Sequence, residues 1–222
     1  MKNIWHRRNK FVFEKKFLSP AQVVQFSIAG HEDYKEARRK GEGGPKAGGD
    51  DRRVLRWRRP EGRSLKANFD AALNETLYLI GVGIVIRDHN GELVAAKCAN
   101  RRYSSSSFAA ESTALWEAME MCKELGLWDV YFEGDAKEVI ESVKREGEND
   151  SRHGQIIEDL QQSLKSCGSW KLGFSHREGN EVAHHLAKMA LYCSNDQYLM
   201  EEGPESINVL LENDKLYSQT VT

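Results

Sequence analysis

Asp70 is the residue whose position ordinary structural chemistry explains least. It stands inside the segment 64–73 (SLKANFDAAL), whose alternation of apolar and polar residues is typical of a β-strand. Aspartate is depleted from strand interiors, because its short side chain competes for backbone hydrogen bonds and its charge resists burial. No requirement of a strand accounts for this carboxylate, so Asp70 is a candidate for chemistry.

Two further acids follow at positions where they could meet Asp70. Glu111 is expected in the first turn of a helix, four and seven residues before Leu115 and Ala118, so it shares the apolar stripe that turns toward a sheet. Asp135 comes directly after a short predicted strand. If the first and fourth strands are neighbours, three carboxylates converge, and their mutual repulsion requires cations.

Both later acids also have ordinary structural explanations. Asp135 and Glu138 fit the pattern of a capping box, D-A-K-E, which alone would place an aspartate at a helix start. A glutamate in the first turn of a helix is stabilised by the helix dipole, which applies to Glu111. The hypothesis of a metal site therefore depends on the three carboxylates occurring together.

The elements that must position these acids follow the order βββαβα(α)βα. Strand patterns cover 65–73, 77–87 and 93–99, and Asn90-Gly91 predicts a hairpin turn between the last two. This order predicts an α/β fold with a five-stranded mixed sheet flanked by helices, and no internal repeat is visible. The remaining helices and strands are expected over 106–125, 130–134, 135–145, 154–167, 169–176 and 180–193.

Charge and composition divide the chain into segments. Residues 1–60 hold 16 Lys and Arg against 7 Asp and Glu, and the remainder holds 16 against 27, so net charges of +9 and −11 give the overall −2. A basic arm is often a tether for nucleic acid, but a charge excess of this size is more often a solvated segment, and both interpretations stay open. The predicted segments are a basic, partly helical N-terminal segment, a flexible linker, the α/β domain and an acidic C-terminal tail: 1–40, 41–63, 64–193 and 194–222.

The cysteines and the hydropathy indicate the cellular setting. Cys98, Cys122, Cys167 and Cys193 include no CxxC pair, which disfavours a zinc site and fits buried thiols in a reducing, intracellular compartment, either nucleus or cytoplasm. No apolar run approaches the ~20 residues of a membrane span, and the N-terminus is too charged for a secretory signal. We therefore expect a soluble protein without membrane contact, acting as a monomer.

Five motifs, in order and spacing, resemble the segments of a type 1 ribonuclease H domain of the kind associated with plant retrotransposon reverse transcriptases. The resemblance covers about residues 64–193, and the flanks IWHRRNKFVFEKKFLSP and MEEGPESINVLLEND also resemble neighbouring segments of such retroelement proteins. Each motif is weak alone, and the specificity comes from five in register. The motifs are LKANFDAAL, GVGIVIRDHNGELV, AAESTALWEAM, YFEGDAKEVI and REGNEVAHHLAK.

The resemblance implies a metal-dependent endonuclease that hydrolyses the RNA strand of RNA–DNA hybrids. In that family, carboxylates corresponding to Asp70, Glu111 and Asp135 hold two Mg²⁺ ions, with Mn²⁺ as a substitute, for in-line phosphodiester hydrolysis. Selection of RNA would depend on contacts to the 2′-hydroxyl in a wide minor groove. Asn74 and Ser112 are the residues we suggest for that contact.

The chain departs from the family pattern at the fourth metal position. The pattern GNExAD is GNEVAH here, so His184 stands where an aspartate is expected. Imidazole is a poor Mg²⁺ ligand but can hold a water or transfer a proton, which implies modified or reduced activity. His176, in the loop after the fifth strand, is a second candidate, since family members can carry a histidine there that assists product release.

Two other functional classes remain to be compared with the nuclease. A nucleic-acid-binding relic of a retrotransposon polyprotein would keep the fold and lose hydrolysis, which the histidine at position 184 and the acidic domain favour. Exonucleases of related fold require an acidic D-x-E pair in the first strand, and the residues from Asp70 onward read DAA. That absence disfavours the exonuclease class.

Overall fold

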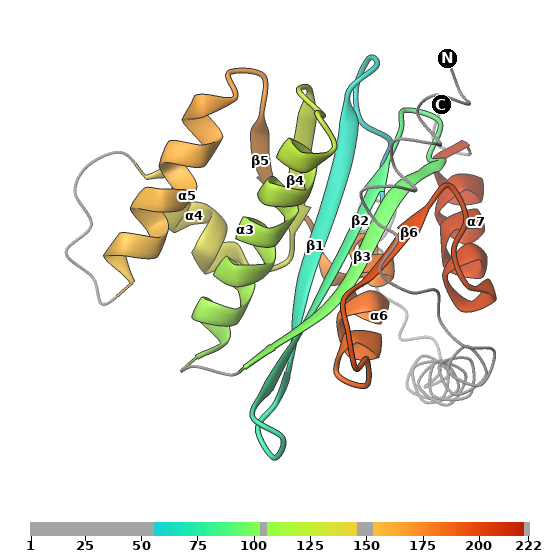
Figure 1. The fold of residues 1–222 in the computed structure, drawn as a ribbon. Coiled ribbons are helices and arrows are strands. Elements are labelled where there is room, and N and C mark those ends of the chain that lie inside the picture. The colour runs from blue at the N-terminus through green and yellow to red at the C-terminus, as the bar shows by residue number, and fades with distance from the viewer. Residues whose placement is uncertain (1–55, 103–105, 146–152, 220–222) are drawn as a thin grey trace, which may run out of the picture.

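A six-stranded mixed sheet forms the centre of the molecule (Figure 1). The computed structural model of the chain describes residues 56–102, 106–145 and 153–219. Its elements in chain order are β1 (Leu65–Asn74), β2 (Leu79–Arg87), β3 (Leu93–Arg102), α3 (Ser107–Glu124), β4 (Val130–Gly134), α4 (Lys137–Lys144), α5 (Gly154–Ser166), β5 (Lys171–Phe174), the 3₁₀ helix η2 (Arg177–Gly179), α6 (Glu181–Ala190), β6 (Gln197–Met200) and α7 (Glu205–Gln219).

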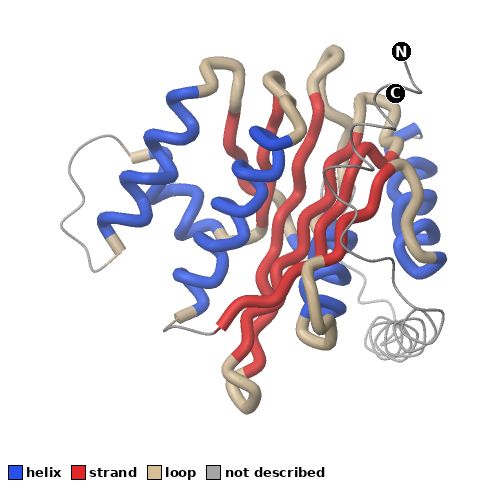
Figure 2. Tube along the Cα trace, viewed as in Figure 1, coloured by secondary structure: helices blue, strands red, loops and turns tan. Residues whose placement is uncertain are grey.

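The strands lie in the order β5-β4-β1-β2-β3-β6, and Figure 2 shows them as a sheet in the middle of the molecule with helices around it. The pairs β1–β4 and β4–β5 are parallel, whereas β1–β2, β2–β3 and β3–β6 are antiparallel. The first and fourth strands are therefore neighbours, as the metal hypothesis required. A mixed sheet of this α/β type, flanked by helices, is what the sequence predicted.

Helices cover both faces of the sheet and enclose a hydrophobic core on each. Helices α3, α4 and α5 lie over one face, where their apolar residues pack on alternate residues of β1 and β2 such as Phe69, Val82 and Ile84. Helices α6 and α7 enclose a smaller core against Val85 and residues of β3. Because β2 is covered on both sides, it consists almost entirely of buried residues.

The predicted hairpin between β2 and β3 is present, but its turn is longer than a two-residue turn. Gly91 has a positive φ of 84°, whereas Asn90 does not. The Gly91 backbone N–H donates to the Asp88 carbonyl, and the Asp88 N–H donates to the Glu92 carbonyl, each at 3.0 Å. A register shift at Ile86/Arg87 accommodates the extra residues.

The predicted count of five strands is wrong, because β6 pairs with the free edge of β3. Both β6 and α7 lie in the segment 194–222 that the sequence suggested was an acidic tail. The α7 side chains of Ile207 and Leu211 are buried in the second core. This segment therefore contributes a strand and a helix to the fold.

Arg87 connects the two flanks of the domain. This fully buried guanidinium donates to Asp214 of α7 at 2.6 Å and to the Asn68 side chain at 2.8 Å. Its Cζ atom also lies 3.8 Å from the ring centroid of Trp57, whose indole N–H donates to Asn68 at 3.0 Å. Trp57 is 2% exposed, although it falls within the predicted linker. We call these four residues, Trp57, Asn68, Arg87 and Asp214, the Arg87 cluster.

Some expectations concern residues outside the described part of the chain. These are the partly helical segment 1–40 and the linker up to residue 55. Over residues 56–102, 106–145 and 153–219, every helix is too short or too polar to span a bilayer. The four cysteines are all free and buried.

Candidate metal centre

The register of the sheet places the two aspartates side by side. Strand β4 pairs with β1 in parallel, with Asn68 opposite Glu133. Continuing this register by two residues brings position 135, just past the end of β4, alongside position 70. Asp70 is 2% exposed, and the side chain of Asp135 is 14% exposed. A parallel pairing of these two strands is thus sufficient to bring both carboxylates to one place.

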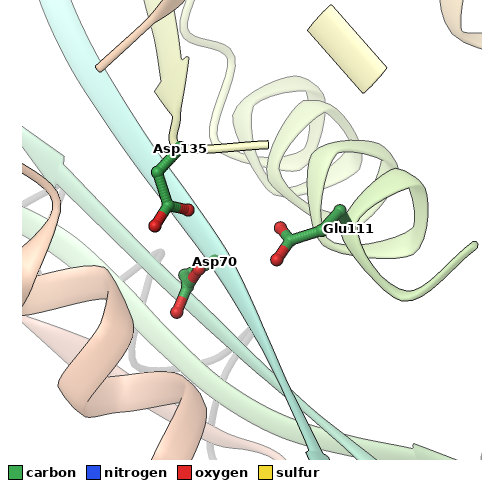
Figure 3. A group of neighbouring side chains, drawn as sticks. All are labelled: Asp70, Glu111 and Asp135. Atoms are coloured by element: carbon green, nitrogen blue, oxygen red, sulfur yellow. The ribbon is translucent and has the colours of Figure 1, made fainter. Parts of the chain in front are cut away.

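Glu111 approaches the aspartates from helix α3 (Figure 3). The helix begins at Ser107, with the Ser106 hydroxyl accepting from the Ala109 N–H, so Glu111 lies in the second turn and not in the first as predicted. The helix dipole at the N-terminus therefore does not explain this glutamate. Leu115 and Ala118 are fully buried on the same stripe, so Glu111 faces the sheet as expected.

The three carboxylates form one compact group. One oxygen from each of Asp70, Glu111 and Asp135 lies within 4.8 Å of the others, and no other such group occurs among the described residues. Burial, reinforced by the negative charges of Asp70 and Asp135, raises the pKa of Glu111 to about 9. Burial and Asp70 also raise the pKa of Asp135. Without a cation, this group is electrostatically unfavourable.

The capping explanation for Asp135 is not realised in the structure. Helix α4 begins at Lys137, its N-cap is Ala136, and no side chain makes a capping hydrogen bond there. The Asp135 carboxylate instead faces Asp70 (Figure 3). The capping box was the best structural explanation of Asp135 from sequence, and it does not form.

His184 lies beside Asp70 but outside the group of three carboxylates. Its Nδ1 atom is 2.7 Å from Asp70 Oδ2, and its side chain is 21% exposed. Arg177 of η2 also contacts the imidazole, with Nη2 at 2.7 Å from His184 Nε2 and 3.1 Å from Nδ1, and its Nη1 lies 3.4 Å from Asp135 Oδ2. A histidine and an arginine thus border the acidic group.

The other predicted site residues are not drawn into this group. His176 is exposed, and its ring packs edge-on against Phe174 with centroids 5.1 Å apart. The Asn74 side chain accepts from the Leu77 N–H at 2.9 Å and so stabilises the turn after β1. Ser112 is fully buried next to Glu111, and its hydroxyl has no hydrogen-bond partner among the described residues.

Sequence reasoning missed the residues that bring α6 to the site. The Asn180 side chain donates to the Phe69 carbonyl at 2.9 Å, which ties the start of α6 to β1 directly before Asp70. Gly83 lies opposite Asp70 in the β1–β2 pair, and a Cβ there would collide with the backbone of Ala183 and Ala187. The G-V-G alternation in β2 was the available signal, since glycine in a strand interior often marks a close backbone approach.

Comparisons with known proteins identify the family of the chain. The family model described as Reverse transcriptase-like matches residues 68–190, more than half of the chain. No curated protein matches the chain.

Two solved structures are similar in fold. RNase H1 from the halophilic archaeon Halobacterium salinarum NRC-1 is 25% identical with a TM-score of 0.52, and the match covers 58% of this chain and 97% of that one. LC11-RNase H1, isolated from compost by a metagenomic approach, is 16% identical with a TM-score of 0.52, and the match covers 59% and 97%. Asp70, Glu111 and Asp135 all lie within the family match. The chain belongs to the Reverse transcriptase-like family, within the ribonuclease H-like superfamily.

Proposed function

We propose that this protein is a metal-dependent endonuclease that hydrolyses the RNA strand of RNA–DNA hybrids and derives from a retroelement. The observation that carries the proposal is the convergence of Asp70, Glu111 and Asp135 from β1, α3 and the end of β4 in a ribonuclease H-like fold. The likeness to an archaeal RNase H1 at 25% identity supports the nuclease class. The Reverse transcriptase-like family supports the retroelement origin.

The residues present fit a hard divalent cation. All three side chains offer carboxylate oxygens, the ligands that Mg²⁺ prefers and Mn²⁺ accepts. Glu111 Oε2 is buried with no hydrogen-bond partner among the described residues, so a cation would supply the interaction that this atom lacks. The family resemblance implies two such ions. Bound Mg²⁺ would activate a water and stabilise the leaving oxygen of the phosphodiester.

The protein's own groups would hold and orient the reacting strand. Asp70 is fixed in a central strand and Asp135 by the parallel register, so their oxygens keep one position relative to the backbone. Of the two residues suggested for the 2′-hydroxyl, Asn74 is engaged in its turn and Ser112 is fully buried, so either contact would require a change of conformation. The segment 1–60, with its charge of +9, would supply phosphate affinity that the acidic remainder lacks.

A cleavage assay with the full chain tests the proposal. We expect the wild type to cut the RNA strand of a labelled hybrid with Mg²⁺ or Mn²⁺ and to stop when the metal is chelated. Asp70→Asn should abolish cutting while the protein stays folded, because the amide keeps the shape and loses the charge. Asp129→Asn, at an exposed position before β4, is the matched control and should cut normally.

The alternative is a binding relic without hydrolysis. It is favoured by His184 and Arg177, which place a hydrogen-bond donor and a cation against the two aspartates. A folded wild type that binds hybrid yet leaves it intact at every metal concentration would select this alternative.

A further inference from the structure

Arg177 combines a fixed backbone with an exposed side chain. The Asn180 N–H donates to the Arg177 carbonyl, and the Gly179 N–H to the His176 carbonyl, each at 2.9 Å. Asn180 in turn holds this segment on β1 through the Phe69 carbonyl. The Arg177 side chain itself is 59% exposed. Its guanidinium can therefore move while its attachment point stays beside the acidic group.

The guanidinium reaches both aspartates, one directly and one through His184. Arg177 Nη2 lies 2.7 Å from His184 Nε2 and 3.1 Å from Nδ1, and Nδ1 lies 2.7 Å from Asp70 Oδ2. Arg177 Nη1 also lies 3.4 Å from Asp135 Oδ2. Both imidazole nitrogens are therefore already in contact with protein groups.

The spacing of the carboxylates suits a single ion. An octahedral ion with ligands at ~2.1 Å holds them ~3 to ~4.2 Å apart, close to the span of 4.8 Å within which the three oxygens lie. A second ion ~4 Å from the first would have to share carboxylates with it. On Asp70 and Asp135, the Oδ2 atoms already contact His184 and Arg177.

Charge supports the same assignment. Arg177 forms an ion pair with Asp135, with 3.4 Å between Nη1 and Oδ2. The guanidinium therefore places a positive charge against this carboxylate, as a cation does.

We propose that Arg177, oriented by His184, stands where a second divalent ion would share Asp70 and Asp135. The acidic group then holds one divalent ion tightly and admits a second only by displacing Arg177. The inference rests on the proposed function, because it takes the three carboxylates to be a metal site.

Calorimetric titration with Mn²⁺ alone, on metal-free full-length protein without nucleic acid, tests it. We expect the wild type to bind one ion per chain in the tight phase. Arg177→Gln should bind a second ion and bind the first severalfold more tightly, because the competing charge is gone. Arg63→Gln removes an exposed arginine that precedes β1 and should behave as the wild type. Thermal melts confirm that each variant is folded.

Three outcomes overturn the inference, and one of them also removes the proposed function. Two ions bound with similar affinity by the wild type would show that Arg177 blocks nothing. If Arg177→Gln binds Mn²⁺ with the same stoichiometry and affinity as the wild type, then Arg177 does not block a second ion, although the metal site itself exists. A folded wild type that binds no Mn²⁺ would instead refute the metal site itself and the nuclease proposal with it.

Discussion

At the residue scale, Asp70 lies between an acidic and a basic environment. Glu111 and Asp135 stand on one side, and the imidazole of His184 stands on the other at 2.7 Å. Each group changes the free energy of the charged carboxylate, in opposite directions. The balance among four side chains, more than any single one, decides how strongly the site attracts a cation.

Replacing His184 by aspartate should shift this balance in two measurable ways. A fourth carboxylate adds a hard oxygen ligand, so Mg²⁺ should bind about tenfold more tightly in calorimetry. In chelator the same variant should melt at a lower temperature than the wild type, because the added charge increases repulsion.

His89→Asp adds the same charge at an exposed position of the β2–β3 turn, and it should leave Mg²⁺ affinity unchanged. If His184→Asp has the same Mg²⁺ affinity as His89→Asp, then position 184 does not contribute to the metal site.

Sequence reasoning reached the three carboxylates because Asp70 has no ordinary explanation and the other two follow at element positions where they could meet it. Asp70 contradicts strand preference, and Glu111 lies on a stripe that must face the sheet. Arg177 violates no rule, since an exposed arginine in a short polar loop is ordinary. Its role depends on the distance to Asp135, which is 42 residues away in the chain. The local sequence around Arg177 therefore gives no sign that it lies near Asp135.

At the element scale, the close contact between α6 and β2 holds His184 beside the acids. Gly81 and Gly83 leave room for the α6 backbone, and a Cβ at either position would collide with it. The helix thus lies against the strand without intervening side chains. Small residues in β2 determine how near α6 comes to Asp70.

Gly83→Ala should therefore be costly. The added methyl meets the rigid backbone of Ala183 and Ala187, so we expect the free energy of unfolding, measured with urea, to fall by about 3 kcal/mol. Gly168→Ala introduces the same methyl where no atom lies within 4 Å, and it should change stability by less than about 0.5 kcal/mol. Similar values for the two variants would contradict the packing argument.

The Arg101–Asp196 pair connects β3 to the start of β6, and its contribution to stability should depend on pH. Arg101 of β3 donates two hydrogen bonds of 2.8 Å to Asp196, just before β6, and lowers the pKa of that carboxyl. A carboxyl whose pKa is lowered by folding stabilises the protein at pH values above its unfolded-state pKa of 3.8. This stabilisation is lost as the pH falls through the folded-state pKa.

The wild type should thus exceed Asp196→Asn in stability at pH 7, by about 1 kcal/mol at most for so exposed a pair. The difference should vanish as pH falls below 3.8, which denaturant unfolding at several pH values measures. A difference that stays constant over this range would exclude Asp196 ionisation as its source.

The elements missed from sequence were those whose pattern is interrupted. Strand β6 has four residues and none of them is fully buried, so its alternation is too short to recognise. In α7 the buried stripe runs Ile207, Leu211, Asp214, and its third member is a charge. A helix stripe that ends in aspartate looks like an exposed face from sequence. Only the ion pair of Asp214 with Arg87 shows that the stripe is buried. The strands and helices with continuous apolar patterns were all predicted.

At the scale of the whole molecule, the Arg87 cluster joins segments from both flanks of the domain. Asp214→Asn would leave the fully buried guanidinium without its carboxylate, which should cost about 3–5 kcal/mol in urea unfolding. Glu212→Gln, an exposed change on the same helix, should cost less than about 0.5 kcal/mol. Equal stabilities would mean that α7 docks without the ion pair.

The Arg87–Asp214 pair also has a consequence for biosynthesis. The two residues are 127 positions apart, so at ~5–20 residues per second the ribosome adds Asp214 roughly 6–25 s after Arg87. During that interval β1 and β2 are already synthesised, but Arg87 has no carboxylate to neutralise it in the core. The nascent domain must therefore keep this edge open to water until α7 has been synthesised and docks on it.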